Sequence, residues 1–228
     1  MSQPSQIPAK FINHVVIGDA RQLLGELPDN SVDMIFTDPP YHQKYLYLYD
    51  LLAKQGSRIL KPGCWAFIYG GWVAPEIYDI LGAGEWQYFM TIAVTNRASN
   101  PRWWSKKLLI GFKPIYVFTK GEPIIHSWQN NLIDTNTIDK RYHKWGQGIG
   151  SAITKIEQFT NPGGIVLDPF CGGGQTAEAS KITGRNFVTF EIDKDTAKVA
   201  RDRINQQKPL LFAPQPKQKE LPILEGSQ

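Results

Sequence analysis

A glycine-rich turn between an apolar run and a helical segment constrains the fold of this 228-residue chain more than any other feature. The apolar run 165–167 (Ile-Val-Leu) predicts a buried strand, which leads through Asp168 into the turn Gly172-Gly173-Gly174. Residues 176–182 then have apolar side chains at helical spacing. A strand, a glycine turn and a helix in this order predict an α/β fold with a mostly parallel sheet and a ligand at the carboxyl end of the strand.

Strand and helix patterns alternate along most of the chain, which supports the same fold class. We expect further strands over residues 14–17, 32–36, 65–69, 89–94, 115–119 and 187–190. We expect further helices over residues 20–27, 46–60, 75–81, 151–159 and 195–205. The segment Lys61-Pro62-Gly63 is expected to end the second of these helices. Alternation of this kind predicts a sheet that helices cover on both faces.

Residues 96–147 interrupt the alternation. Residues 11–95 and 148–205 carry the alternating patterns, and we expect them to form one α/β domain. Residues 1–10 and 206–228 are polar and contain prolines, which predicts flexible tails. The interrupting segment is therefore expected to be an insertion in a single domain.

The insertion 96–147 interleaves basic residues with tryptophans, a combination that suits contact with nucleic acid. The same side chains are equally compatible with a packed core and a solvated surface. The candidate nucleic-acid contacts are Arg97, Arg102, Lys106, Lys107, Arg141 and Lys144. The net charge of +4 permits a polyanionic partner without requiring one.

The composition excludes several classes of protein. Two cysteines, Cys64 and Cys171, provide neither a disulfide framework nor a zinc cluster. The four histidines lack metal-ligand spacing, so we expect no metal site. No apolar run is long enough to span a bilayer, and the polar N-terminal residues do not form a signal peptide. We therefore expect a cytoplasmic protein.

Glu191 and the glycine turn together indicate a nucleoside cofactor. Glu191 ends the next predicted strand, at about the 20-residue spacing at which an acid reaches the ribose hydroxyls of a cofactor. No lysine follows the glycines as it does in a phosphate-binding loop, which disfavours a nucleoside triphosphate. Asp168 is placed to bind a cationic amino group. The alternative is a glycine turn that binds no ligand.

The segment Asp38-Pro39-Pro40-Tyr41 follows the predicted strand 32–36 and is suited to hold an amine. Its two prolines fix the backbone and remove two donors, which leaves carbonyl groups and the Asp38 carboxylate as acceptors. An amino group that donates both hydrogens to such acceptors is drawn out of planarity, and its lone pair becomes available for attack. Tyr41 offers a ring on which a base flipped out of a duplex could stack. The alternative is a proline turn with a surface tyrosine.

Together the two segments resemble the amino-methyltransferases that use S-adenosyl-L-methionine, most closely the DNA adenine N6-methyltransferases. Residues 168–174 (Asp-Pro-Phe-Cys-Gly-Gly-Gly) resemble the first motif of that family, and residues 38–41 resemble its catalytic motif. The catalytic motif comes first, which is the circularly permuted order of the β group. The resemblance implies a Rossmann-like class I methyltransferase fold with a seven-stranded sheet in the order 3-2-1-4-5-7-6. It also implies double-stranded DNA as the substrate and a small target-recognition segment at 96–147.

The resemblance assigns roles to single residues. Asp38 and the Pro39 carbonyl would hold the target amine, and Pro40 and Tyr41 complete the catalytic motif. The residues that would bind S-adenosyl-L-methionine are Asp19, Asp168, Phe170, Cys171, Gly172, Gly174, Glu191 and Asp193. Residues 143–148 differ from the stretch that usually precedes the first motif, so no residue is assigned to the methionine end of the cofactor.

Other substrates and a non-enzymatic function stay open at this point. The same chemistry could act on cytosine N4, on RNA or on a protein glutamine, although aspartate rather than serine or asparagine at position 38 disfavours cytosine and glutamine. The second alternative is a nucleic-acid-binding module that keeps the fold without catalysis. A second copy of the chain and a cognate restriction enzyme are further partners to consider.

Overall fold

The computed structural model describes residues 6–71, 76–95, 102–103, 107–123, 131–134 and 149–206. Most of the predicted C-terminal tail (207–228) and the first five residues of the N-terminal one lie outside this set. Residues 6–10 belong to the predicted N-terminal tail, but Ile7 packs against the core and Lys10 forms an ion pair with Glu26 at 2.5 Å.

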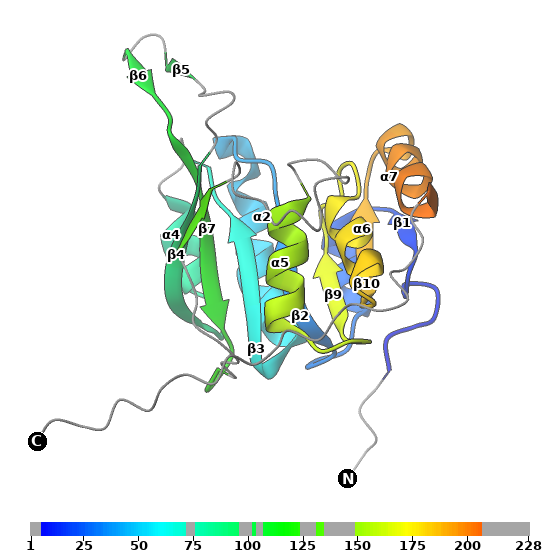
Figure 1. The fold of residues 1–228 in the computed structure, drawn as a ribbon. Coiled ribbons are helices and arrows are strands. Elements are labelled where there is room, and N and C mark those ends of the chain that lie inside the picture. Colours follow the sequence, from blue (N-terminus) through cyan, green and yellow to red (C-terminus); the bar gives the residue numbers. More distant parts are fainter. Residues whose placement is uncertain are drawn as a thin grey trace, which may run out of the picture.

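Within the described residues, one eight-stranded sheet forms the middle layer of the molecule (Figure 1). Its strands in spatial order are β1 (Val15–Ile17), β10 (Asn186–Glu191), β9 (Ile165–Asp168), β2 (Val32–Thr37), β3 (Leu60–Tyr69), β7 (Phe112–Thr119), β4 (Gln87–Thr95) and β8 (Leu132–Asp134). The five strands from β1 to β3 are parallel, whereas β7 runs antiparallel to both of its neighbours.

This order confirms the predicted 3-2-1-4-5-7-6 arrangement, with β9 as strand 1, β2 as strand 4 and β7 as strand 7. The prediction of seven strands needs one correction, because an eighth strand is present. Leu132–Asp134 pairs in parallel with residues 93–95 at the open edge of β4 and extends the sheet. Both β7 and this strand lie inside the segment 96–147 that we expected to be an insertion, so that boundary is wrong: residues 112–119 and 132–134 belong to the main sheet.

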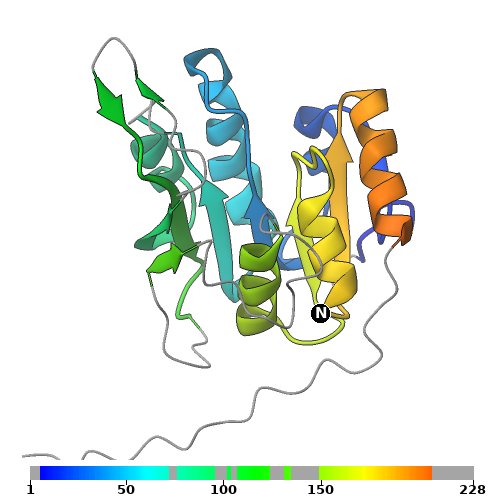
Figure 2. The same cartoon turned by 45° about the horizontal axis from the view of Figure 1, so that its top comes forward.

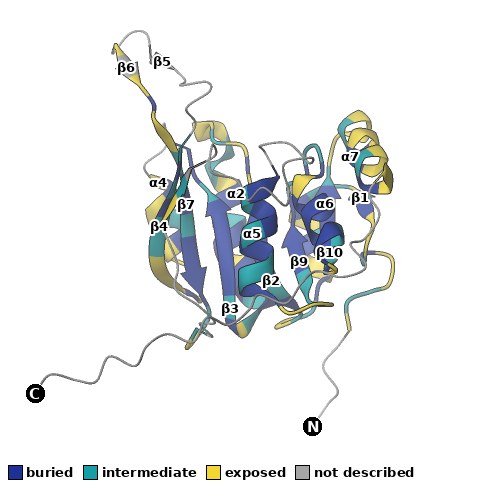
Figure 3. Ribbon diagram, in the orientation of Figure 1, coloured by how far each residue is buried: buried dark blue, intermediate teal, exposed yellow. Residues whose placement is uncertain are grey.

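Helices cover both faces of the sheet. One face carries α5 (Gly150–Phe159), α6 (Gln175–Ile182) and α7 (Lys194–Gln206). The other carries α1 (Ala20–Leu23), α2 (Leu46–Leu51), α3 (Ser57–Ile59) and α4 (Glu76–Gly82). Alternate residues of β2 and β3 enter the two cores, and Figure 3 shows these central strands as almost wholly buried.

The predicted helix over 46–60 is only partly correct. The chain forms α2, then a π-helical segment, η3 (Leu52–Gly56), and then α3, and β3 begins at Leu60. Pro62 therefore lies in a strand rather than after a helix. The pairing of β2 with β3 shifts register between Val32 and Met34, and this bulge accommodates the proline and Gly63, whose φ is 78°.

Two 3-10 helices, η1 (Leu24–Glu26) and η2 (Gln43–Tyr45), and two short strands complete the described fold. The strands β5 (Arg102–Trp103) and β6 (Leu108–Leu109) pair with each other as a separate two-stranded ribbon. Figures 1 and 2 show this ribbon projecting beyond the edge at which the parallel strands end. No helix in the described part of the chain has the length and apolarity needed to cross a membrane.

Candidate active site

The two segments singled out in the sequence meet at one edge of the sheet. Strands β2 and β9 are neighbours, with Ile35 opposite Leu167, so the residues that follow both strands emerge side by side. The hydroxyl of Thr37 donates a hydrogen bond of 2.7 Å to Oδ1 of Asp168, and both residues are buried. A direct side-chain contact therefore joins the strand before Asp38 to the strand before the glycine turn.

The glycine turn has a backbone that requires glycine at two positions. Gly172 and Gly174 have φ values of 48° and 81°, in the left-handed region that other residues adopt at a cost. A Cβ on Gly174 would also stand 2.9 Å from the Cβ of Ala200. Gly174 therefore allows α6 to begin directly under α7, and the backbone of the turn stays tight at the end of β9.

Asp168 is a buried carboxylate whose described hydrogen-bond donors are neutral. It accepts hydrogen bonds from the Thr37 hydroxyl and, at 3.2 Å, from the amide of Phe170. Burial raises the pKa of Asp168 to about 6, and these bonds hold it below a still higher value. A cation beside Asp168 would favour its charged form, so the site is suited to a positively charged group.

Glu191 connects the glycine turn to the start of α7. Its Oε2 accepts the Gly172 amide at 2.9 Å, and its Oε1 accepts the Asp193 amide at 3.0 Å. A carboxylate offers about four acceptor positions, so two remain for a ligand. The position and partial exposure of Glu191 fit a residue that receives two vicinal hydroxyl groups.

The other two acids of the cofactor prediction each cap a helix. Asp19 accepts hydrogen bonds from the amide and side chain of Arg21 at the start of α1, and Asp193 accepts from the amide and hydroxyl of Thr196 in α7. These bonds hold the pKa of both carboxyls below the usual range. Capping accounts for both residues without a ligand, so their cofactor role stays a prediction.

Phe170 and Cys171 pack beneath the turn. Phe170 is partly buried against the main core, and Cys171 is almost fully buried beside α6 and α7. Burial raises the pKa of the Cys171 thiol to about 12, which leaves it protonated and unreactive at neutral pH. Cys171 is therefore a small buried side chain and not a nucleophile.

The Asp38 carboxylate follows β2 at this edge and is held by two side chains. Tyr41 donates its hydroxyl hydrogen to Oδ1, and the ammonium of Lys113 donates to Oδ2 at 2.7 Å. Burial raises the pKa of Asp38, and the Lys113 charge opposes that rise. The Lys113 ammonium also lies 4.6 Å from the centre of the Tyr41 ring and 4.4 Å from that of Tyr69.

Neighbouring residues fix the rest of the catalytic motif. Pro39 is buried and Pro40 exposed. The hydroxyl of Tyr49, a fully buried core residue, lies 3.5 Å from the Pro39 carbonyl oxygen and 3.2 Å from that of Tyr69. A Cβ on Gly71 would stand 2.5 Å from the Cβ of Tyr41, so the absence of a side chain there gives Tyr41 its place.

Lys113, Tyr69 and Gly71 are site residues that the sequence did not single out. Lys113 counted only as one of many basic residues in the segment 96–147. The signal that could have found it is the direction of β7, because an antiparallel strand starts at the edge where its parallel neighbours end. Gly71 follows a predicted strand as the second glycine of a pair, which is a weaker signal of a close approach.

The candidate nucleic-acid residues are mostly not described. Lys107 is exposed between β5 and β6 with a φ of 50°, and the backbone of Arg102 pairs with Leu109. Arg97, Lys106, Arg141 and Lys144 lie outside the described residues, as does the side chain of Arg102. Their contact with nucleic acid stays a prediction.

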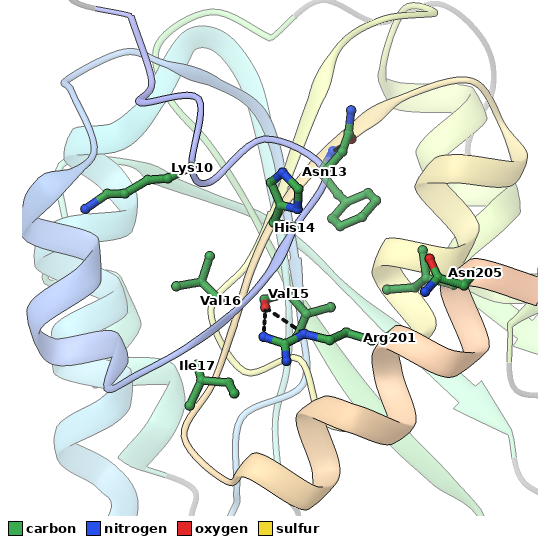
Figure 4. A pocket seen from close by; sticks show the side chains of 10 residues that line it. Lys10, Asn13, His14, Val15, Val16, Ile17, Arg201 and Asn205 are labelled. Carbon is green, nitrogen blue, oxygen red and sulfur yellow. Dashed lines mark hydrogen bonds between the residues drawn. The ribbon is translucent and has the colours of Figure 1, made fainter.

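A hollow of about 490 Å³ lies elsewhere, between β1 and α7 (Figure 4). Its lining includes His14 and Arg201, whose guanidinium donates to the Val15 carbonyl at 2.7 Å. None of the residues predicted for the cofactor or the amine lines it. Among the described residues no group of three or more histidine, cysteine or acidic side chains could hold a metal ion.

Comparisons with known proteins agree with this geometry. The DNA methylase family N6_N4_Mtase matches residues 151–202, which span α5, the glycine turn and Glu191. The Type II methyltransferase M.BglII of Bacillus subtilis is 24% identical over 252 residues, covering 86% of this chain and 70% of its own.

Two solved structures show the same fold. The M1.HpyAVI–SAM complex superposes with a TM-score of 0.67 at 24% identity, covering 84% of this chain and 98% of its own. PvuII DNA methyltransferase, described as cytosine-N4-specific, superposes with a TM-score of 0.67 at 16% identity, covering 88% and 92%. With both motifs at one sheet edge in the permuted order, the chain is similar in sequence and fold to S-adenosylmethionine-dependent DNA amino-methyltransferases.

Proposed function

We propose that this chain transfers a methyl group from S-adenosylmethionine to the exocyclic amine of a base flipped out of double-stranded DNA, and that the base is adenine. The observation that carries the proposal is the buried bond between Thr37 and Asp168. It joins the strand that presents the amine acceptors to the strand that presents the glycine turn. A cofactor at the turn and an amine at Asp38 would then face each other.

The residues at the turn suit S-adenosylmethionine by their chemistry. Glu191 has acceptor positions for two ribose hydroxyls, and the buried Asp168 favours a cationic amino group. We propose the same role for Phe170, Cys171, Gly172 and Gly174, which form the turn, and for Asp19 and Asp193, which flank Glu191. When bound, the cofactor supplies an electrophilic methyl group on a positively charged sulfur.

The residues at Asp38 suit the target amine. The Asp38 carboxylate and the Pro39 carbonyl accept the two amine hydrogens, which turns the nitrogen lone pair toward the methyl group. Methyl transfer would place positive charge on the nitrogen, and Asp38 would stabilise this charge until the nitrogen loses a proton to solvent. The rings of Tyr41 and Tyr69 offer faces for the base and for the growing charge.

Adenine is preferred over cytosine because position 38 is aspartate rather than serine. The likeness to the cytosine-N4-specific PvuII enzyme means that the fold alone supports either base. We propose that the parts of 96–147 outside the main sheet recognise the target sequence, and the projecting β5–β6 ribbon supports this role. A homodimer and a cognate restriction enzyme are further proposals that rest on the family alone.

Transfer of a tritiated methyl group tests the proposal. Purified protein is incubated with labelled S-adenosylmethionine and unmethylated genomic DNA, and the DNA is hydrolysed to nucleosides and separated. We expect the label to appear in N6-methyl-2′-deoxyadenosine. Label in N4-methylcytosine would correct the base, and no label in any DNA, with cofactor still bound, would favour a binding module.

A further inference from the structure

The Lys113 ammonium makes three of the contacts that the proposed function assigns to a flipped base and its amine. It donates to the Asp38 carboxylate at 2.7 Å and lies over the rings of Tyr41 and Tyr69 at 4.6 and 4.4 Å. The same acceptor and the same two rings are the ones a flipped base would use. An ammonium and a base amine cannot both occupy this position.

The fold brings Lys113 to this position from a strand that carries neither motif. Strand β7 is antiparallel to β3, so its first residues lie at the edge where β3 and β2 end. Lys113 pairs with Val94 in the last part of the β4–β7 ladder, and Tyr69 is the final residue of β3. The backbone of Lys113 is therefore fixed by the sheet, whereas its side chain is held by contacts with Asp38, Tyr41 and Tyr69.

The chemistry of the ammonium matches that of the amine at the moment of methyl transfer. Both offer N–H donors to a carboxylate, and both carry positive charge that an aromatic face attracts. We propose that Lys113 is an internal stand-in for the target amine, which occupies the Asp38 site of the free enzyme until a flipped base displaces it. This inference rests on the proposed function, because it takes Asp38 as the amine acceptor.

The position of Lys113 in the chain suggests how DNA could promote its release. Strand β6 of the projecting ribbon leads through Ile110 and Gly111 into β7, so Lys113 stands at the base of that ribbon. A Cβ on Gly111 would meet no described atom within 4 Å. Contact of the ribbon with DNA would therefore act on the strand that carries the displaced residue.

Displacement of Lys113 from Asp38 should weaken the binding of target DNA by a measurable amount. The ion pair is partly exposed, with 31% of the Lys113 side chain and 49% of that of Asp38 accessible, so the competition should be modest. We expect Lys113→Met to lower KM for target DNA by about 3- to 10-fold and so to raise kcat/KM. Lys198→Met is the matched control, because it removes an equal charge from a surface ion pair with Asp202 on α7.

A magnetic resonance experiment tests occupancy without relying on catalysis. In full-length protein with ¹³C-labelled lysine ε-methylenes, the Lys113 signal is assigned by its loss in Lys113→Met. Ring currents from the two tyrosines should shift this signal upfield in the free protein. An unmethylated duplex that contains the target sequence found in the transfer assay is then added. This should return the Lys113 signal to the range of exposed lysines.

Each outcome decides the inference. An unshifted Lys113 signal in the free protein would overturn it, and so would a shifted signal that persists under saturating target DNA. A fall in kcat of Lys113→Met at unchanged KM would instead make Lys113 a positioning residue for Asp38. If the wild-type protein methylates no DNA, the proposed function fails, and the signal of the free protein still shows whether the ammonium occupies the site.

Discussion

Binding of the cofactor should weaken when the pH is lowered through 6, because Asp168 must be ionised to hold a cationic amino group. Asp168 is 4% exposed, and burial raises the pKa of its carboxyl to about 6. Such a group is about 90% ionised at pH 7 and about 10% ionised at pH 5, so affinity should fall about tenfold, or ~1.4 kcal/mol.

Ionisation of Asp168 also affects the free energy of unfolding of the free protein. Most acidic residues stabilise a folded protein as the pH rises, whereas Asp168 should destabilise it. The pKa of Asp168 is higher in the folded protein than the value of about 3.9 in an unfolded chain. Between these values the folded protein binds more protons, so stability falls as the pH rises from about 4 to about 6. The loss amounts to about 3 kcal/mol, and a cation bound at Asp168 would offset it.

Isothermal titration calorimetry with S-adenosylhomocysteine between pH 5 and 8 would measure this dependence. Asp168→Asn should bind weakly at every pH in the range, without the step near 6. Thr37→Val removes a hydrogen bond to the charged carboxylate and should move the step to higher pH. Wild-type affinity that does not change between pH 5 and 7, or an unchanged step in Asp168→Asn, would refute the assignment of Asp168 as the amino-group partner.

Three substitutions test the remaining parts of the site. Asp38→Ala should abolish methyl transfer while changing cofactor affinity less than about threefold, since it removes an acceptor for the amine; equal loss of both would place Asp38 at the cofactor. Gly71→Ala should lower kcat by roughly tenfold or more by displacing Tyr41, whereas Gly25→Ala, whose Cβ would meet no described atom within 4 Å, should not. Glu191→Ala should weaken cofactor binding by roughly 1–3 kcal/mol, and calorimetry that finds no change would remove it from the site.

The strand order and the meeting of the two motifs could be predicted from the sequence because they follow from parallel topology. Strands read from apolar runs end in Asp38, Asp168 and Glu191, and parallel neighbours end at one edge. The observed contact between Thr37 and Asp168 follows from that register. These features depend on residues close in sequence to a strand end, which is where pattern reasoning is strongest.

The features that the sequence did not predict depend on pairing between distant segments. Lys113 reaches Asp38 because β7 lies antiparallel beside β3. The residues around Lys113 in the sequence do not indicate that Asp38 is its partner. The eighth strand is three residues long and forms only against the free edge of β4. Pro62 was expected to end a helix, but a bulge against β2 lets it stand inside β3.

Electrostatics links the two halves of the site and predicts how the cofactor should affect Lys113. Burial raises the pKa of both Asp38 and Asp168, and the charge of Asp38 raises that of Asp168 further. A positively charged sulfur bound near both carboxylates would reduce the attraction of Asp38 for the Lys113 ammonium. S-adenosylmethionine should therefore move the Lys113 resonance toward the range of exposed lysines, whereas S-adenosylhomocysteine, which lacks the sulfonium charge, should move it less. An equal change of the Lys113 resonance with the two ligands would show that the sulfonium charge does not weaken the contact between Lys113 and Asp38.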